Sequence, residues 1–162
     1  NMNVEYPTDE THENCTNNSI GKYKWNKVVL GKSDIDNIGL FPYELILEGD
    51  LIIEYLGHEI YGRDYIKHNI NRYCMQLSNR VIDASEHGSL ARFINHACTA
   101  NAEFRKVVVN GITRVGVYAK TNIGISEEIT CDYLRYSTPN GNNSYQCMCT
   151  SGCNNWLKDI CL

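Results

Sequence analysis

The stretch of sequence that decides the fold covers residues 92–101 and reads Arg-Phe-Ile-Asn-His-Ala-Cys-Thr-Ala-Asn. A second stretch, residues 127–133, reads Glu-Glu-Ile-Thr-Cys-Asp-Tyr. Neither the 3.6-residue period of an amphipathic helix nor the two-residue period of a half-buried strand generates this pair of stretches. The formation of a helix or a strand therefore does not by itself explain why both stretches occur in one chain.

Length and composition bound the class of protein. A chain of 162 residues is the size of one domain and can bury a sizeable core. Hydrophobic residues make up 43% of the chain and charged residues 21%, as in ordinary soluble globular proteins. No apolar run approaches the roughly 20 residues of a membrane span, so no membrane association is expected. The net charge of −4 argues against direct, sequence-specific nucleic-acid binding and favours a basic partner.

Three of the eight cysteines lie close together near the end of the chain. Cys147, Cys149 and Cys153 fall within seven residues. This spacing is too tight for independent disulfide bridges, but it suits thiolates around one zinc ion. The alternative is three free surface thiols.

Short strands dominate the local patterns. Residues 45–56 predict two short strands around a turn at Gly49-Asp50. Residues 104–109 and 112–119 predict a hairpin, because Asn110-Gly111 suits a type I′ turn in which both residues have positive φ. Further strands are expected at 72–77 and 81–82, and weak helical character at 63–71. These patterns predict a mainly β domain with few short helices.

Together, residues 92–101 and 127–133 resemble the twin signature of SET-domain protein lysine methyltransferases, R-F-I-N-H-S-C-x-P-N followed by E-L-T-[FY]-D-Y. The resemblance extends over about residues 22–160. It implies several small curved β-sheets around a knot-like crossing of the chain near the active site. It also implies three segments: a polar lead-in at 1–21 with a remnant of an AWS-like cysteine segment, a SET domain at 22–136, and a linker with a post-SET zinc segment at 137–162.

The same resemblance implies a protein-lysine N-methyltransferase. The methyl donor would be S-adenosylmethionine, and the substrate a histone tail or nucleosome in the nucleus. Cys15-Thr16-Asn17 and residues 106–111 are most similar to the branch that methylates lysine 36 of histone H3. The domain is expected to be monomeric. Two alternatives stay open: a catalytically weak SET module that binds histones or other proteins, and a lysine methyltransferase for a non-histone protein.

The catalytic residues implied by the resemblance are tyrosines. Methyl transfer is an in-line displacement by a neutral amine, and a narrow apolar channel beside the sulfonium favours loss of the lysine proton. Tyr133 would orient the lysine nitrogen, while Tyr55 and Tyr73 would line the channel. Cys131 stands where the family carries a Phe or Tyr that controls how many methyl groups are added. Because Cys131 is small and a weak hydrogen-bond donor, we expect di- or trimethylation. Taken singly, each of these aromatic residues is also a candidate for the core.

The implied donor site draws on several segments. Asn95 would accept a hydrogen bond from the donor's ammonium, and His96 would contribute mainly backbone contacts to the adenine. The other residues that the resemblance places around the donor are Asn37, Ile38, Gly39, Arg72, Tyr73, Arg92, Phe93, Tyr145, Trp156 and Leu157. The donor loop departs from the family's K-G-x-G, because it reads Asp36-Asn37-Ile38-Gly39. Asn is the residue other than Gly that best tolerates positive φ, so we expect the loop to keep its shape.

The cysteine-rich tail resembles a post-SET zinc site, in which C-x-C-x4-C is completed by the Cys of N-H-S-C. The implied ligands of a structural Zn²⁺ are Cys98, Cys147, Cys149 and Cys153. The last spacing is one residue shorter than in the family, and Cys161 ranks second as a substitute ligand. Zinc would tie the tail over the donor.

Overall fold

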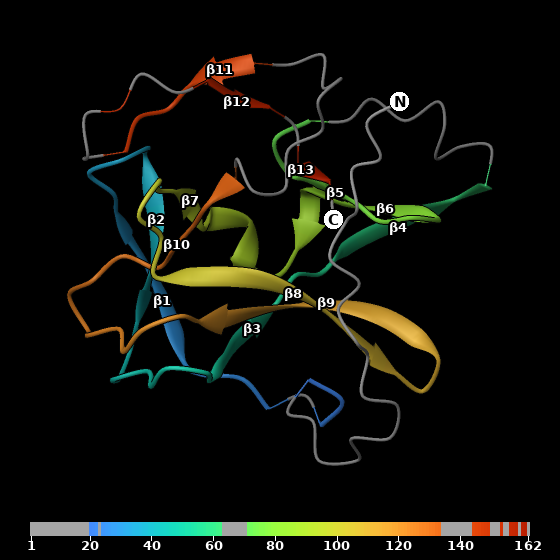
Figure 1. Ribbon diagram of the computed structural model, residues 1–162, viewed down its shortest axis with the longest axis horizontal. Coiled ribbons are helices and arrows are strands. Elements are labelled where there is room, and N and C mark those ends of the chain that lie inside the picture. The colour runs from blue at the N-terminus through green and yellow to red at the C-terminus, as the bar shows by residue number, and fades with distance from the viewer. Residues whose placement is uncertain are drawn as a thin grey trace, which may run out of the picture.

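The computed structural model describes residues 20–22, 24–62, 71–133, 144–149, 153, 156–158 and 160–161. Within these ranges the chain forms short strands and the 3-10 helix η1 (Leu90–Phe93), which confirms the predicted mainly β class (Figure 1). No helix among the described residues is long and apolar enough to cross a membrane. The weak helix expected at 63–71 and the polar lead-in fall almost wholly outside the described residues.

The central sheet has the order β3-β9-β8-β10-β7. Its strands are β3 (Leu51–Glu54), β7 (Asn95–His96), β8 (Ala102–Val109), β9 (Ile112–Ala119) and β10 (Thr130–Cys131). Strands β8 and β9 pair antiparallel without a break, and the turn between them has Asn110 at φ 51° and Gly111 at φ 78°. The predicted hairpin with a type I′ turn is therefore confirmed.

Strands β7 and β10 pair in parallel, with Thr130 opposite Asn95 and Cys131 opposite His96. This pairing joins the two signature stretches of the sequence side by side in the sheet. Consequently, residues that follow β10 in the chain lie next to residues that follow β7.

Three smaller sheets surround the central one. They are formed by β1 (Val28–Lys32) with β2 (Ile38–Pro42); by β13 (Ile160–Cys161), β5 (Cys74–Gln76), β6 (Arg80–Gly88) and β4 (Gly57–Tyr61); and by β11 (Ser144–Gln146) with β12 (Trp156–Lys158). Figure 1 shows β11 and β12 at the top of the molecule, above β7 and β10.

Some local predictions were wrong. Residues 45–48 form no strand, and Ile46 contributes only a single bridge to Ile123. The strand expected at 81–82 runs on to Gly88 as β6. Strands β1 and β2 were not predicted, because Val29, Leu30 and Ile38 are exposed and the inside–outside alternation is absent.

The main core fills the space between the central sheet and its neighbours. Its fully buried side chains include Ile46, Ile52, Met75, Ile94, Val115, Val117 and Ile129. Each such side chain contributes about 1.5–3 kcal/mol by burial. Helix η1 contacts β1, β2, β3 and β6, so the start of the first signature stretch is held from several sides.

Candidate functional site

One cavity collects most of the residues singled out from the sequence. Its walls come from the loop between β1 and β2, the turn before β5, η1, β7, the residue after β10, and the cysteine-rich tail. The lining residues are Ile35, Asp36, Asn37, Ile38, Arg72, Tyr73, Arg92, Phe93, Ile94, Asn95, His96, Tyr133, Gln146, Met148 and Leu157. The cavity therefore lies where the two signature stretches, the donor loop and the tail meet.

Tyr133 is held at the cavity by both its backbone and its hydroxyl. Its N–H donates to Nδ1 of His96 at 2.9 Å, and its hydroxyl donates to the carbonyl of Ile94. The rings of His96 and Tyr133 lie 5.6 Å apart. The hydroxyl proton is thereby directed to Ile94.

His96 links Tyr133 to the cysteines through its side chain, which the sequence did not predict. Since Nδ1 accepts from Tyr133, the ring proton belongs on Nε2, which lies 3.3 Å from the sulfur of Cys98. Burial lowers the pKa of His96 below its ordinary value and so favours the neutral ring that this arrangement requires.

The loop between β1 and β2 has a residue with positive φ at the position where the family's first Gly is replaced. Asn37 has a φ of 43°, the left-handed conformation that Gly adopts without strain and that Asn tolerates best among other residues. Asn37 thus takes the positive φ expected of it, and the expectation that the loop keeps the family's shape stays a prediction. Beside it, Asp36 forms a 3.3 Å ion pair with Arg72, so the loop is connected to the turn before β5.

Arg92 lies against the aromatic lining of the cavity. Its guanidinium is 4.8 Å from the centre of the Tyr73 ring and 5.3 Å from that of Phe93, and it donates to the carbonyl of Ser85. These contacts fix a positive charge and two rings in one wall.

Besides Gly39 and the metal-site cysteines, two described residues singled out from the sequence, Tyr55 and Cys131, do not line this cavity. Tyr55 is 5% exposed, its hydroxyl donates to the carbonyl of Tyr73 at 2.8 Å, and its ring meets Phe104 edge-on. Burial raises the pKa of Tyr55. Cys131 is fully buried in the main core, and burial raises the pKa of its thiol as well. Both therefore support the cavity from the core side and do not form its surface.

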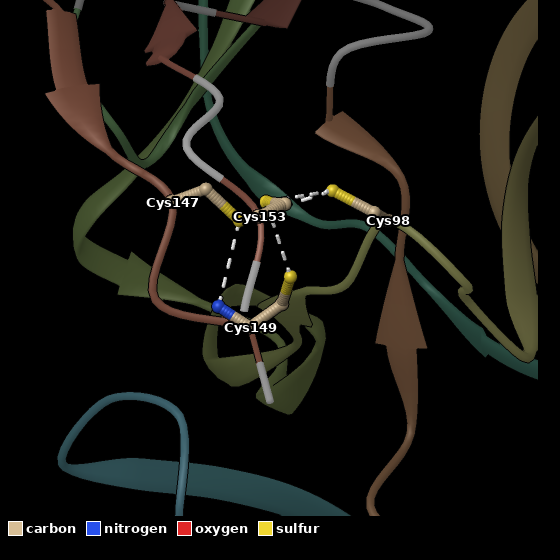
Figure 2. A group of neighbouring side chains, drawn as sticks. All are labelled: Cys98, Cys147, Cys149 and Cys153. Carbon is tan, nitrogen blue, oxygen red and sulfur yellow. Dashed lines mark hydrogen bonds between the residues drawn. The ribbon is translucent and has the colours of Figure 1, made fainter. Parts of the chain in front are cut away.

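Four cysteines converge next to the cavity (Figure 2). The sulfurs of Cys98, Cys147, Cys149 and Cys153 all lie within 4.8 Å of one another. Sulfur–sulfur distances are 3.9 Å for Cys98–Cys147, 3.3 Å for Cys98–Cys153 and 3.4 Å for Cys149–Cys153. A tetrahedral zinc with bonds of about 2.3 Å places its sulfurs roughly 3.8 Å apart, so the set fits such an ion.

The electrostatics of the cluster favour neutral thiols unless a cation is bound. Burial is the largest cause that raises the pKa of the Cys147 thiol well above its ordinary value. A thiolate is therefore costly there unless a cation lies beside it, and a metal ion deprotonates its thiol ligands. Cys161 pairs with Gln76 in β13, and Cys74 is a buried core residue as expected.

The tail contributes a wall that was only partly predicted. Leu157 lines the cavity and is 3% exposed, as expected for a residue that covers a ligand. Gln146 and Met148 also line it. No sequence pattern indicated these two, because each is an ordinary residue beside a cysteine. The side chains of Tyr145 and Trp156 fall outside the described residues, so their expected place over the adenine stays a prediction.

The cavity carries complementary groups for a zwitterionic ligand with a flat ring. The side-chain oxygen of Asn95 can accept from an ammonium, and Arg72 and Arg92 can donate to a carboxylate. Phe93, Met148 and Leu157 offer apolar surface to a ring.

Comparisons with known proteins agree with this arrangement. The model of the SET domain family matches residues 37–134. A protein of Aspergillus fumigatus, "Histone-lysine N-methyltransferase, H3 lysine-4 specific", is 37% identical over 87% of this chain and 12% of its own length. Human "Histone-lysine N-methyltransferase SETD1A" is 34% identical over 85% of this chain and 8% of its own. The chain thus spans only a small part of these relatives.

The fold has a similar counterpart among solved structures. A chain in the crystal structure of an active polycomb repressive complex 2 in the basal state superposes with a TM-score of 0.65 and 31% sequence identity. The match covers 74% of this chain and 17% of that chain. Taken with the match of the family model to residues 37–134, this shows that the chain belongs to the SET domain family.

Proposed function

We propose that this chain transfers methyl groups from S-adenosylmethionine to a lysine of histone H3, with lysine 4 as the target. The observation that carries the proposal is the parallel pairing of β7 with β10, because it brings Asn95 and Tyr133 into the lining of one cavity. Relatives named as histone-lysine N-methyltransferases support the reaction class. A nuclear location follows from a chromatin substrate and is part of the proposal.

Four residues of the cavity have a role in binding or aligning the reactants in this proposal. The oxygen of Asn95 accepts from the donor's ammonium, and Arg72 and Arg92 lie near its carboxylate. S-adenosylmethionine, when bound, supplies an electrophilic methyl on its sulfonium. Tyr133 donates its own proton to Ile94, so its oxygen accepts an N–H of the incoming amine and aims the nitrogen lone pair at the methyl.

The tail completes the site in this proposal. A Zn²⁺ held by Cys98, Cys147, Cys149 and Cys153 ties the segment 137–162 to the SET domain at 22–136. Leu157 and Met148 then cover the donor.

The proposed target differs from the one expected from the sequence. The similarity of residues 106–111 and Cys15-Thr16-Asn17 to the lysine 36 branch finds no support among the relatives reported above. The printed name of the fungal relative specifies lysine 4 of histone H3. We therefore propose lysine 4 and treat lysine 36 as the competing outcome.

A catalytically weak binding module was suggested by two departures from the family's sequence, Asn37 in the donor loop and the shortened spacing before Cys153. The geometry at both positions disfavours such a module. Asn37 takes the left-handed conformation that the altered donor loop needs. The shortened spacing before Cys153 still brings its sulfur within reach of the other three.

The test is methyl transfer to nucleosomes, with mass spectrometry to locate the modified residue. Three nucleosomes are compared: unaltered, with arginine in place of lysine 4 of histone H3, and with arginine in place of lysine 36. The proposal expects that only the lysine 4 replacement abolishes transfer. Transfer that persists there and is lost with the lysine 36 replacement would contradict the proposed target, and no transfer to any histone would contradict the activity.

A further inference from the structure

Glu128 belongs to the second signature stretch, residues 127–133. Its side chain contacts Ser33, which lies just before the donor loop in the chain. The hydroxyl of Ser33 lies 3.0 Å from Oε1 and 2.8 Å from Oε2 of Glu128. The same hydroxyl oxygen accepts from the backbone N–H groups of Ile35 at 2.8 Å and Asp36 at 3.2 Å. Ser33 is 7% exposed, so this is a largely desolvated contact. The carboxylate of Glu128 thus holds Ser33, whose hydroxyl oxygen accepts from the backbone of Ile35 and Asp36.

Asn95 is drawn into the same contact. Its amide nitrogen lies 2.8 Å from Oε1 of Glu128, 3.1 Å from the hydroxyl of Ser33, 3.1 Å from the carbonyl of Ile38 and 3.2 Å from that of Asp36. All four atoms are acceptors, so they select the NH₂ end of the amide. Among the described residues none donates to the side-chain oxygen of Asn95, which is left for a ligand in the cavity.

Gly39 makes room for this approach. A Cβ at Gly39 would collide with the side chain of Glu128. On the neighbouring residues, the N–H of Ile129 donates to the carbonyl of Leu40 at 2.8 Å, which holds the backbone after Glu128 against β2. The absence of a side chain at Gly39 and the hydrogen bond between Ile129 and Leu40 therefore both favour the contact between Glu128 and Ser33.

We infer that Glu128 is a positioning residue for the methyl donor. Ser33, Glu128 and Asn95 form what we term the loop clamp, which holds the loop from Asp36 to Gly39 and turns the amide oxygen of Asn95 toward the donor's ammonium. The inference rests on the proposed function. Without the carboxylate, the NH₂ group of Asn95 loses the shortest of its four contacts. Rotation of the amide, which would present the NH₂ group to the donor's ammonium and is repulsive, then becomes less costly.

The test is calorimetric titration of S-adenosylmethionine into the 162-residue chain and its variants. Glu128→Gln places a second amide beside that of Asn95, and Ser33→Ala removes the hydroxyl from the loop clamp. Both should raise the dissociation constant about tenfold or more, since hydrogen bonds to charged groups are among the stronger ones in proteins. Ser33→Thr keeps the hydroxyl and should restore most of the affinity.

The matched control is Glu127→Gln, one residue away. Glu127 accepts from the amide of Asn101 at 3.0 Å and from the N–H of Gly124 at 3.4 Å, and the structure shows no contact between it and the described residues of the donor loop. This variant should bind the donor as the unaltered chain does.

Kinetics separate positioning from general damage. With saturating donor, Glu128→Gln should keep kcat within about twofold while KM for the donor rises, because removed ground-state binding appears in KM. Unchanged donor affinity in both Glu128→Gln and Ser33→Ala would overturn the loop clamp. An equal loss of affinity in Glu127→Gln would overturn it too. Failure of the unaltered chain to bind the donor would instead contradict the proposed function itself.

Discussion

The two walls of the cavity, one from the core and one from the tail, are held in place by different interactions. The core wall, residues 92–96 with Tyr133, combines the end of η1, strand β7 of the five-stranded sheet and the second residue after β10 (Figure 1). Within this wall, Ile94 is 1% exposed. The tail wall, Gln146, Met148 and Leu157, belongs to short paired strands and the segment between them.

The difference lies in how much of each wall is apolar core. The core wall packs on a large cluster that contains most of the buried apolar side chains among the described residues. The tail wall packs on a small cluster of Cys147, Cys149 and Leu157. We therefore expect much of the free energy that holds the tail wall to come from the four sulfurs and an ion bound between them. We infer that folding of the core sets the position of Tyr133, whereas metal binding sets the cover of the cavity.

The largest effect on catalysis is expected from the core wall. Tyr133→Phe removes the hydroxyl that orients the amine and should lower kcat by about 10²–10⁴-fold, with donor affinity nearly unchanged. Steady-state kinetics together with calorimetry check this. The control is Tyr118→Phe, which removes the hydroxyl of a half-buried tyrosine in β9 and should leave kcat unchanged. Near-normal turnover in Tyr133→Phe would remove this residue from the mechanism.

A smaller effect is expected on the stability of the core, without an effect on the tail. Arg114 donates to both carboxylate oxygens of Glu54, which is 2% exposed. Arg114→Ala leaves that buried carboxylate without its main partner and should cost about 3–5 kcal/mol in denaturant unfolding.

An exposed ion pair, Arg105 with Glu103, provides the control for this prediction. Arg105 lies 2.7 Å from Glu103 with 45% of its side chain exposed, so Arg105→Ala should cost about 1 kcal/mol or less. Zinc content should be the same in both variants. Loss of zinc in folded Arg114→Ala would show that the two walls are not independent.

The smallest expected effect concerns the number of methyl groups added. Cys131 is small and fully buried beneath the site, and we predict di- or trimethylated product by mass spectrometry. Cys131→Phe and Cys131→Tyr crowd the core alike, so their difference isolates the hydroxyl. The Tyr variant should stop at fewer methyl groups than the Phe variant. Monomethyl product alone from the unaltered chain, together with the same products from both variants, would contradict the role of Cys131.

The core wall was easier to predict from the sequence than the tail wall. The signature residues Asn95, His96 and Tyr133 share a cavity as expected, and Asn110-Gly111 predicted its hairpin because the turn chemistry is local. The parallel pairing of β7 with β10 could not be derived from local pattern, because each strand has only two residues.

Other features escaped prediction because they depend on tertiary contacts. Tyr55 was expected at the lysine channel, but its position in the core is decided by Phe104 and Tyr73, which are distant in sequence. Gln146 and Met148 line the cavity only because neighbouring cysteines turn the chain there. Similarly, no motif indicated that Glu128 would reach Ser33.

The most direct test of the account compares donor binding with and without the metal cluster. S-adenosylmethionine is titrated into the zinc-loaded chain, the chelated chain and Cys149→Ser, while hydrogen exchange follows β8 and β9. The account predicts one zinc per chain, loss of at least about tenfold in donor affinity in the chelated chain and in Cys149→Ser, and unchanged protection of the hairpin. Full donor affinity in a chain shown by metal analysis to hold no zinc would contradict it.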